Sequence, residues 1–304
     1  MKNRAEVIFK LVDVICEPLQ NSVHIDGITC VKDIKYGDMD IQSFDIYYKT
    51  EEENKLKPVI FYIHGGGFVM GGKRYRRSIA EILASLGYAV VNVDHRLAPQ
   101  HVFPACIEDA VSAINFLLNV KDEYSLDLSK VVLCGDSSGG YIASFLAAAY
   151  SSEDIRNRLS LPDIAVKIIG LIGLSGVYDV KKMISMKFSL GIPQKVGESL
   201  MGMKLKRNLK NLSEYEYIDC ISTLDLVNEN WVPTLVVHAK KDLMCPKQGD
   251  VLLEKLRECG VPTSEHYAKK LLDNHCYILF NSRKESRNAI KSVEKFLADV
   301  VNNK

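Results

Sequence analysis

The stretch from Lys130 to Ala149 reads KVVLCGDSSGGYIASFLAAA, an apolar strand-like run followed by an Ala-rich segment of helical character. Between the two, residues 135–139 (GDSSG) match the pattern G-x-S-x-G. A serine at the centre of this pattern occupies a sharp strand-to-helix turn, which glycine neighbours permit and from which its hydroxyl projects above the sheet. The flanking strand and helix favour this interpretation over an ordinary glycine-rich turn. The sequence therefore predicts that Ser137 is a nucleophile.

A nucleophilic serine requires donors for the negative charge that develops on the substrate oxygen. Residues 64–68 (HGGGF) directly follow the apolar run 59–63, and three consecutive glycines let the backbone come close to the serine. A phosphate-binding loop is the alternative, but neither G-x-G-x-x-G nor a Walker lysine follows. The predicted oxyanion donors are the backbone N–H groups of Gly65, Gly66, Gly67 and Ser138.

The base should be a histidine that follows the serine along the chain, since this elbow is associated with the order Ser, acid, His. His238 lies inside an apolar strand-like run, and His266 lies in the alternating run 263–267. His275 lies in a loop, where it is free to reach the serine. We therefore predict that His275 is the base and that the other two are structural.

The acid that orients the base is expected in the loop after a central strand. Asp242 comes just after the run 234–238, a position from which a carboxylate can bond the imidazole. Asp225 precedes that run, and Asp273 is too near His275 in sequence to reach its ring easily. Asp242 is thus the predicted third member of a catalytic triad.

Strand-like and helix-like segments alternate along most of the chain, which indicates an α/β fold with a doubly wound, mostly parallel sheet covered on both faces. Two further strand-like segments precede the alternation, at residues 30–36 and 44–48. The central strands are predicted at 59–63, 89–93, 130–134, 168–172 and 234–238, and the helices at 78–86, 107–118, 141–149, 248–258 and 287–300.

The amino-terminal segment is predicted to be an amphipathic helix and not a signal peptide. Lys10 and Asp13 interrupt its apolar run, and no small-residue cleavage site follows. The apolar side of this helix is expected to consist of Val7, Ile8, Leu11, Val12, Val14 and Ile15.

Residues 181–217 do not fit the alternation and lack a strand-like run, so we expect an insertion that folds over the sheet edge as a lid. The segment holds four of the eight methionines. These flexible side chains suit a pocket wall for apolar groups, and ordinary core packing is the alternative. The predicted pocket residues are Phe68, Met183, Met186, Met201 and Met203.

Composition excludes several classes of function. The 39 basic residues nearly balance the 38 acidic ones, and the net charge of +1 gives no basic excess for nucleic-acid binding. The eight cysteines are scattered without a C-x-x-C pair, which predicts free thiols, a reducing cytoplasm and no metal site. No stretch is long and apolar enough to span a bilayer, so no stable membrane insertion is expected.

Together these motifs resemble the hormone-sensitive-lipase-type branch of the α/β-hydrolases, which is marked by HGGG ahead of GDSAGG. The segment 94–105 (DHRLAPQHVFPA), with Glu108-Asp109 after it, is similar to a further block of that family. Asp242-Leu243 and Asn274-His275 fall where the family places its acid and base, and the likeness runs from about residue 59 to the end. Ser138 replaces the usual Ala, His95 replaces the usual Tyr, and the usual Gly before the histidine is missing.

This resemblance implies a single α/β-hydrolase domain over residues 1–304, with a sheet of about eight strands and a helical cap from residues 1–25 and 181–217. It implies hydrolysis of small carboxylic esters of short to medium acyl length through an acyl-enzyme, without cofactor or metal. An amidase or peptidase, or a non-catalytic binding protein on the same scaffold, are the alternatives. Whether the protein forms a homodimer is left open by the sequence.

Overall fold

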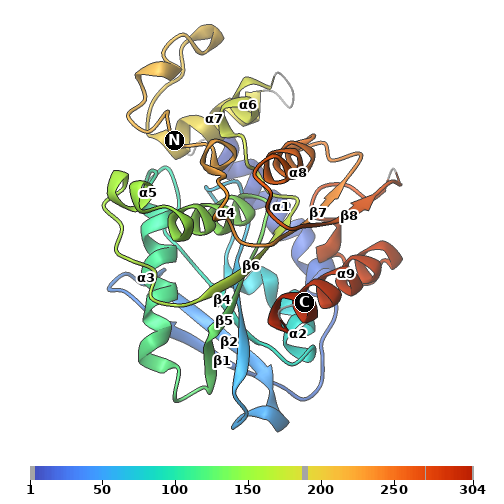
Figure 1. The fold of residues 1–304 in the computed structure, drawn as a ribbon. Helices are drawn as coiled ribbons and strands as arrows, with labels where there is room; N and C mark the ends of the chain where they lie inside the picture. Colours follow the sequence, from blue (N-terminus) through green and yellow to red (C-terminus); the bar gives the residue numbers. More distant parts are fainter. Residues whose placement is uncertain (1–3, 187–190, 271, 303–304) are drawn as a thin grey trace.

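The computed structural model describes residues 4–186, 191–270 and 272–302. Eight strands form one sheet in the order β1-β2-β4-β3-β5-β6-β7-β8 (Figure 1). The pairs β1/β2 and β2/β4 are antiparallel, and the remaining pairs are parallel. The predicted fold class is therefore confirmed. The strands are β1 (Ile28–Lys35), β2 (Ser43–Lys49), β3 (Lys57–Ile63), β4 (Ala89–Val93), β5 (Leu126–Asp136), β6 (Ile168–Leu174), β7 (Thr234–Ala239) and β8 (Thr263–Ala268).

Helices cover both faces of the sheet. Side chains of β3 alternate between two separate hydrophobic clusters, with Phe61 in one and Ile60 and Tyr62 in the other. The first cluster includes α3 (Ala105–Val120), α4 (Ser138–Ser151) and α8 (Gln248–Glu258), and the second includes α2 (Arg77–Ser85) and α9 (Lys284–Val301). Because both faces are buried, the strands read as continuous apolar runs and not as alternating ones.

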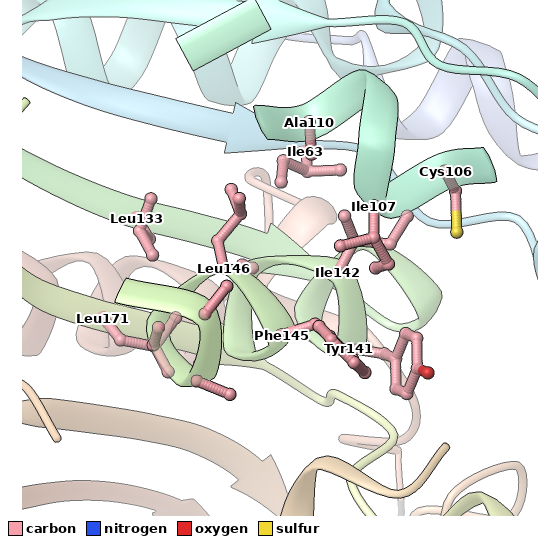
Figure 2. Close-up of a cluster of buried hydrophobic side chains, with 14 of the residues drawn as sticks. Ile63, Cys106, Ile107, Ala110, Leu133, Tyr141, Ile142, Phe145, Leu146 and Leu171 are labelled. Carbon is pink, nitrogen blue, oxygen red and sulfur yellow. The ribbon is translucent and has the colours of Figure 1, made fainter. Parts of the chain in front are cut away.

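The helix after the elbow, α4, is the most deeply buried helix of the fold. Its side chains from Tyr141 to Ala149 are fully shielded from solvent. Figure 2 shows Ile142 of this helix beside Ile107 of α3, and Phe145 beside Tyr141. A helix that is apolar all round is expected in such a position. This packing fixes the first turn of α4, where Ser138 lies.

The strand register brings the two glycine motifs together. Ile63 at the end of β3 pairs with Gly135 near the end of β5, so the HGGGF loop and the elbow emerge side by side. The carboxyl ends of β6 and β7 lie at the same edge, because these strands are parallel to β5. Ligands of doubly wound folds bind at this edge.

The amino-terminal helix α1 (Arg4–Gln20) forms as predicted, but its predicted apolar side is wrong for five of its six residues, since all of them except Ile8 are exposed. Val7, Leu11, Val14 and Ile15 are 53–60% exposed. The buried side instead holds Ala5, Phe9 and Asp13, four residues apart. Apolar residues occur nearly all round this helix, so periodicity did not distinguish the side that meets the protein. The buried side of the helix is the one on which Phe9 packs against Gly67.

The segment between β6 and β7 has no strand among its described residues, in agreement with the expectation. It contains α6 (Val180–Ser185), α7 (Ile192–Met201) and the short 3-10 turns η4 (Arg207–Leu209), η5 (Leu212–Glu214) and η6 (Thr223–Leu226). Helix α7 contacts both α6 and α1. In Figure 1 the segment is yellow to gold.

The remaining described elements are short. They are the helix α5 (Glu153–Arg158) and the 3-10 turns η1 (Thr50–Glu52), η2 (Lys73–Arg76) and η7 (Tyr277–Leu279). None of the helices in the described ranges has the length and apolarity needed to cross a bilayer.

Candidate active site

Ser137 lies on the turn between β5 and α4 with an uncommon backbone conformation. Its φ is 52° and its ψ is −120°, a combination that a residue with a side chain adopts only when its surroundings impose it. The surroundings do so here. The Ser137 N–H donates to the carbonyl of Leu174 at 2.9 Å, and the Ser137 carbonyl accepts from the N–H groups of Tyr141 and Val177.

The glycines of the elbow are required by close backbone contacts. A Cβ on Gly135 would lie 2.3 Å from the carbonyl oxygen of Gly139, and one on Gly139 would lie 2.1 Å from that of Ile63. Neither backbone atom can move without disturbing the sheet or the helix. The tight turn thus explains both glycines of the G-x-S-x-G pattern.

The structure brings Ser137, His275 and Asp242 into one hydrogen-bonded chain. His275 Nε2 lies 2.9 Å from Ser137 Oγ, and His275 Nδ1 lies 2.9 and 3.1 Å from the two oxygens of Asp242. Asp242 Oδ1 also accepts from the N–H groups of Met244 and Cys245. The carboxylate is therefore held on the Nδ1 side of the ring, and Nε2 faces the Ser137 hydroxyl.

Asn274 ties the two loops of this chain together. Its Oδ1 accepts from the N–H of Leu243 at 3.0 Å and from the N–H of His275 at 2.7 Å. One side chain therefore fixes the backbone next to both Asp242 and His275. The sequence offered only the dipeptide Asn274-His275 as a signal for this role.

Burial and charge have opposite effects on the two titrating groups. Burial alone would lower the pKa of His275, but its neighbours Cys276, Asp242 and Cys245 together outweigh burial and raise that pKa well above the usual histidine range. Burial alone would raise the pKa of Asp242, but His275 and the two backbone N–H donors hold it below its usual value. The pair is thus poised to stabilise an imidazolium.

The other downstream histidines are engaged elsewhere. His238 Nε2 lies 2.9 Å from Glu265 Oε1, and His266 bonds Ser292 and Glu285 through its two ring nitrogens. The competing acids are likewise engaged with other residues. Asp225 pairs with Lys181, and Asp273 pairs with Arg283.

The glycines of the HGGGF loop lie against the elbow. A Cβ on Gly65 would lie 2.9 Å from Ser137 Cβ and 2.6 Å from the carbonyl oxygen of Asp136. The N–H groups of Gly66 and Gly67 donate to none of the described residues. Ser138 is the first residue of α4, where an N–H has no intrahelical acceptor. Free N–H groups beside a nucleophile are suited to an oxyanion.

His64, which opens this loop, is a neutral structural residue. Its ring stacks on His95 with centroids 4.5 Å apart, and its Nδ1 lies 2.9 Å from the Gly65 carbonyl. Burial lowers the pKa of His64 and of His95 to about 4. The departure from Tyr to His at position 95 therefore supplies a flat, uncharged partner for the start of the loop.

A buried ion pair beneath the elbow was not found by sequence reasoning. Arg76 Nε and Nη2 bond the two carboxylate oxygens of Asp136 at 2.8 and 2.7 Å, and Tyr62 donates to the same carboxylate at 2.9 Å. Burial would raise the pKa of Asp136, but Arg76 outweighs it and holds that pKa below its usual value. Asp136 directly precedes Ser137, so these hydrogen bonds hold the residue at the start of the strand-to-helix turn in place.

We expect Arg76→Met to lower the free energy of unfolding by about 3–5 kcal/mol, because it leaves the Asp136 carboxylate buried without its positively charged partner and with only the Tyr62 hydroxyl as a side-chain donor. Urea denaturation of the variant and the parent protein measures this difference. Lys255→Ala is the control, since the Lys255–Glu258 pair is exposed and should contribute about 0–1 kcal/mol. Equal losses in the two variants would contradict a bracing role for Arg76.

A small apolar cavity of about 90 Å³ opens beside Ser137. Its walls include the elbow, Gly67 and Phe68, and most of the remaining wall comes from two helices. The first is α1, with Ile8, Phe9 and Val12, and the second is α7, with Ile192, Pro193 and Val196. Phe9 also fills the space that a Cβ on Gly67 would occupy. The helices α1 and α7 thus shape the space in front of Ser137.

Of the five predicted pocket residues, Phe68 and Met183 line this cavity. Met201 is buried in the hydrophobic core, and Met186 and Met203 pack against that core. We expected all four methionines to line the cavity, but only Met183 does so among the described residues of its wall. Helix α7 presents Ile192, Pro193 and Val196 to the cavity, while its last residue Met201 faces the core.

Residues 44–256, more than two thirds of the chain, match the model of the BD-FAE family. The chain belongs to the BD-FAE family. It is also similar to the probable carboxylic ester hydrolase LipM of Mycobacterium tuberculosis, at 25% identity over 88% of this chain and 61% of that protein. An acetyl esterase of Salmonella paratyphi B is 28% identical over 62% of this chain and 54% of its own length. The chain spans between about half and three fifths of these curated relatives.

Solved structures share the fold at low sequence identity. The crystal structure of esterase B from Lactobacillus rhamnosis superposes with a TM-score of 0.84 over 98% of this chain and 96% of that one, at 17% identity. A bacterial heroin esterase superposes with a TM-score of 0.73 over 96% and 90%, also at 17% identity. The resemblance to α/β-hydrolases of the hormone-sensitive-lipase type is thereby confirmed.

Proposed function

We propose that this protein hydrolyses carboxylic esters with short to medium acyl groups through an acyl-enzyme on Ser137. The observation that carries the proposal is the chain Ser137 Oγ, His275 and Asp242, with 2.9 Å between Oγ and Nε2, on a strained elbow beside free backbone N–H groups. Two relatives named above are a carboxylic ester hydrolase and an acetyl esterase, which supports the same reaction class.

In the proposed first step, Ser137 Oγ attacks the ester carbonyl while His275 Nε2 accepts its proton. Asp242 stays ionised and stabilises the imidazolium, in keeping with the opposite pKa shifts of the pair. The N–H groups of Gly66, Gly67 and Ser138 bind the oxyanion, while Gly65 brings the loop against the elbow. His275 then returns the proton to the leaving alcohol, and the acyl group remains on Ser137.

In the second step, water replaces the alcohol. His275 takes a proton from the water, which attacks the acyl carbonyl, and the same N–H groups bind the second oxyanion. Collapse releases the carboxylic acid and returns the proton to Ser137.

The cavity sets the proposed acyl size. An apolar cavity of about 150 Å³ admits a benzene ring, so the space of about 90 Å³ beside Ser137 suits an acyl chain of only a few carbons. Rates on aryl esters should therefore peak at short to medium acyl groups and fall toward palmitoyl. A rate that kept rising to palmitoyl, or that jumped when a triglyceride formed an emulsion, would assign a lipase instead.

Phe9→Ala should move this optimum to longer acyl chains, because the ring forms one wall of the cavity. The ratio of kcat/KM for octanoyl over butyryl aryl esters should rise roughly tenfold or more, since each methylene placed in an apolar pocket is worth about 1–3 kcal/mol. Leu11→Ala is the matched control, because Leu11 lies on the same helix but is 58% exposed. An unchanged ratio in Phe9→Ala would remove α1 from the acyl pocket.

An aryl phosphonate tests the reaction class directly. It should stop turnover and add its phosphonyl group to Ser137, which mass spectrometry of peptides locates. A binding protein without triad chemistry would not be labelled. Comparing butyryl ester with butyryl anilide separates esterase from amidase, and faster hydrolysis of the anilide would overturn the ester assignment.

A further inference from the structure

Beside the triad lies a thiol that the proposed reaction does not use. The Sγ of Cys245, Nδ1 or Nε2 of His275 and a carboxylate oxygen of Asp242 all lie within 4.8 Å of one another. Cys245 is 8% exposed, and its own backbone N–H already holds Asp242 at 2.7 Å. Among the described residues this is the one group of three such side chains.

We propose that Cys245, His275 and Asp242 form a binding site for a thiophilic divalent cation such as Zn²⁺, and that its occupation reversibly switches the enzyme off. Thiolate, imidazole and carboxylate together are a ligand set that zinc accepts, and three protein ligands leave a fourth position for water. The effect on turnover rests on the proposed function of the triad, whereas the binding itself does not.

The geometry needs only a small adjustment. Zinc binds sulfur at about 2.3 Å and nitrogen or oxygen at about 2.0–2.2 Å, so ligand atoms of a tetrahedral site lie roughly 3.3–3.6 Å apart. A pair at the upper limit of 4.8 Å must therefore close by about 1 Å. The His275 and Asp242 atoms are already 2.9 Å apart, so the thiol makes most of this movement.

A cation can reach the site through the substrate cavity. Cys245 and Met244 line that cavity together with Ser137. Cys245 therefore lines the cavity and also lies within 4.8 Å of the His275–Asp242 pair.

Coordination would remove the base without breaking a covalent bond of the chain. Cys245 releases its thiol proton to solvent, and its sulfur binds the metal as thiolate. The metal takes Nδ1 of His275, so the ring proton moves from Nδ1 to Nε2 and the imidazole stays neutral. An Nε2 that carries a proton cannot accept one from Ser137. Loss of the metal restores the original tautomer.

The first test compares inhibition by Zn²⁺ in three proteins, each relative to its own metal-free rate. Cys245→Ser should raise the concentration for half inhibition at least tenfold, since even an outer-shell partner is worth roughly 10- to 100-fold in metal affinity. Cys276→Ser is the matched control, because Cys276 is also buried beside His275 but does not belong to the group of three close ligand atoms. A chelator should restore activity in the parent protein.

The second test does not depend on turnover. Co²⁺ added to the Ser137→Ala protein should produce a thiolate-to-cobalt charge-transfer band, which Cys276→Ser retains and Cys245→Ser loses in the same background. Asp242→Asn should weaken the binding. Absence of the band, or equal zinc inhibition of the Cys245→Ser protein and its parent, would overturn the metal site. If the band appears but the parent protein, with Ser137 in place, hydrolyses no ester, the proposed function is overturned and the metal site stands.

Discussion

Ser137→Ala should lower kcat for an aryl ester by roughly 10⁴- to 10⁶-fold, because it removes the nucleophile from a triad whose members act as a unit. The fold should stay intact, since alanine keeps the Cβ and the backbone hydrogen bonds to Leu174, Tyr141 and Val177 do not involve the hydroxyl. Steady-state kinetics measures the first effect, and circular dichroism with thermal unfolding measures the second.

Ser138→Ala is the matched control for this variant. Only the backbone N–H of Ser138 is assigned a role, and alanine stands at this position in the family that the sequence resembles. Turnover should therefore change by less than about tenfold. The assignment of the nucleophile would be wrong if Ser138→Ala were the inactive protein and Ser137→Ala kept its rate.

His275→Ala should reduce turnover by a similar factor, because no other histidine bonds the serine. His238→Ala and His266→Ala should keep most of the activity, since these rings bond Glu265 in one case and Ser292 and Glu285 in the other. Kinetics of the three variants on one ester decides between them. Near-normal rates in His275→Ala would transfer the role of base to another residue.

The same base determines the acid limb of the pH profile. The rate should fall as the pH drops through the pKa of His275, because the protonated ring cannot accept the serine proton. The Asp242 carboxylate raises that pKa above the ordinary histidine value of about 6.5. Asp242→Asn removes the charge, so its residual activity should show an acid limb at lower pH, together with a loss in kcat of about 10⁴-fold. A limb that stayed in place would separate Asp242 from His275.

The glycine motifs and the strand pattern could be interpreted from the sequence because their causes are local. A tight turn excludes Cβ atoms at Gly135 and Gly139, and a sheet buried on both faces requires apolar residues in unbroken runs. These signals were sufficient for the order of strands and helices and for the position of the elbow. They also singled out Ser137, Asp242 and His275, which the structure places in hydrogen-bond contact.

The amino-terminal helix shows where periodicity stopped being informative. Its sequence is apolar on more than one side, so it predicted a helix but not the side that is buried. Only the docking site decided this, because Phe9 fits against Gly67 and carries Asp13 into the protein four residues later. Burial raises the pKa of Asp13 to about 6, and the local sequence pattern does not predict this shift.

What the sequence by itself determined was every feature whose cause lies within a few residues along the chain: the alternating elements, the elbow and its glycines, and the loop that precedes it. What only the tertiary structure decided was every contact between distant residues. Arg76 reaches Asp136 across 60 positions, and Cys245 comes to lie beside His275. Such contacts leave no periodic signal, because a single charged or sulfur-bearing side chain is equally compatible with a solvated surface. Its partner is fixed only when the packed strands and helices bring the two together.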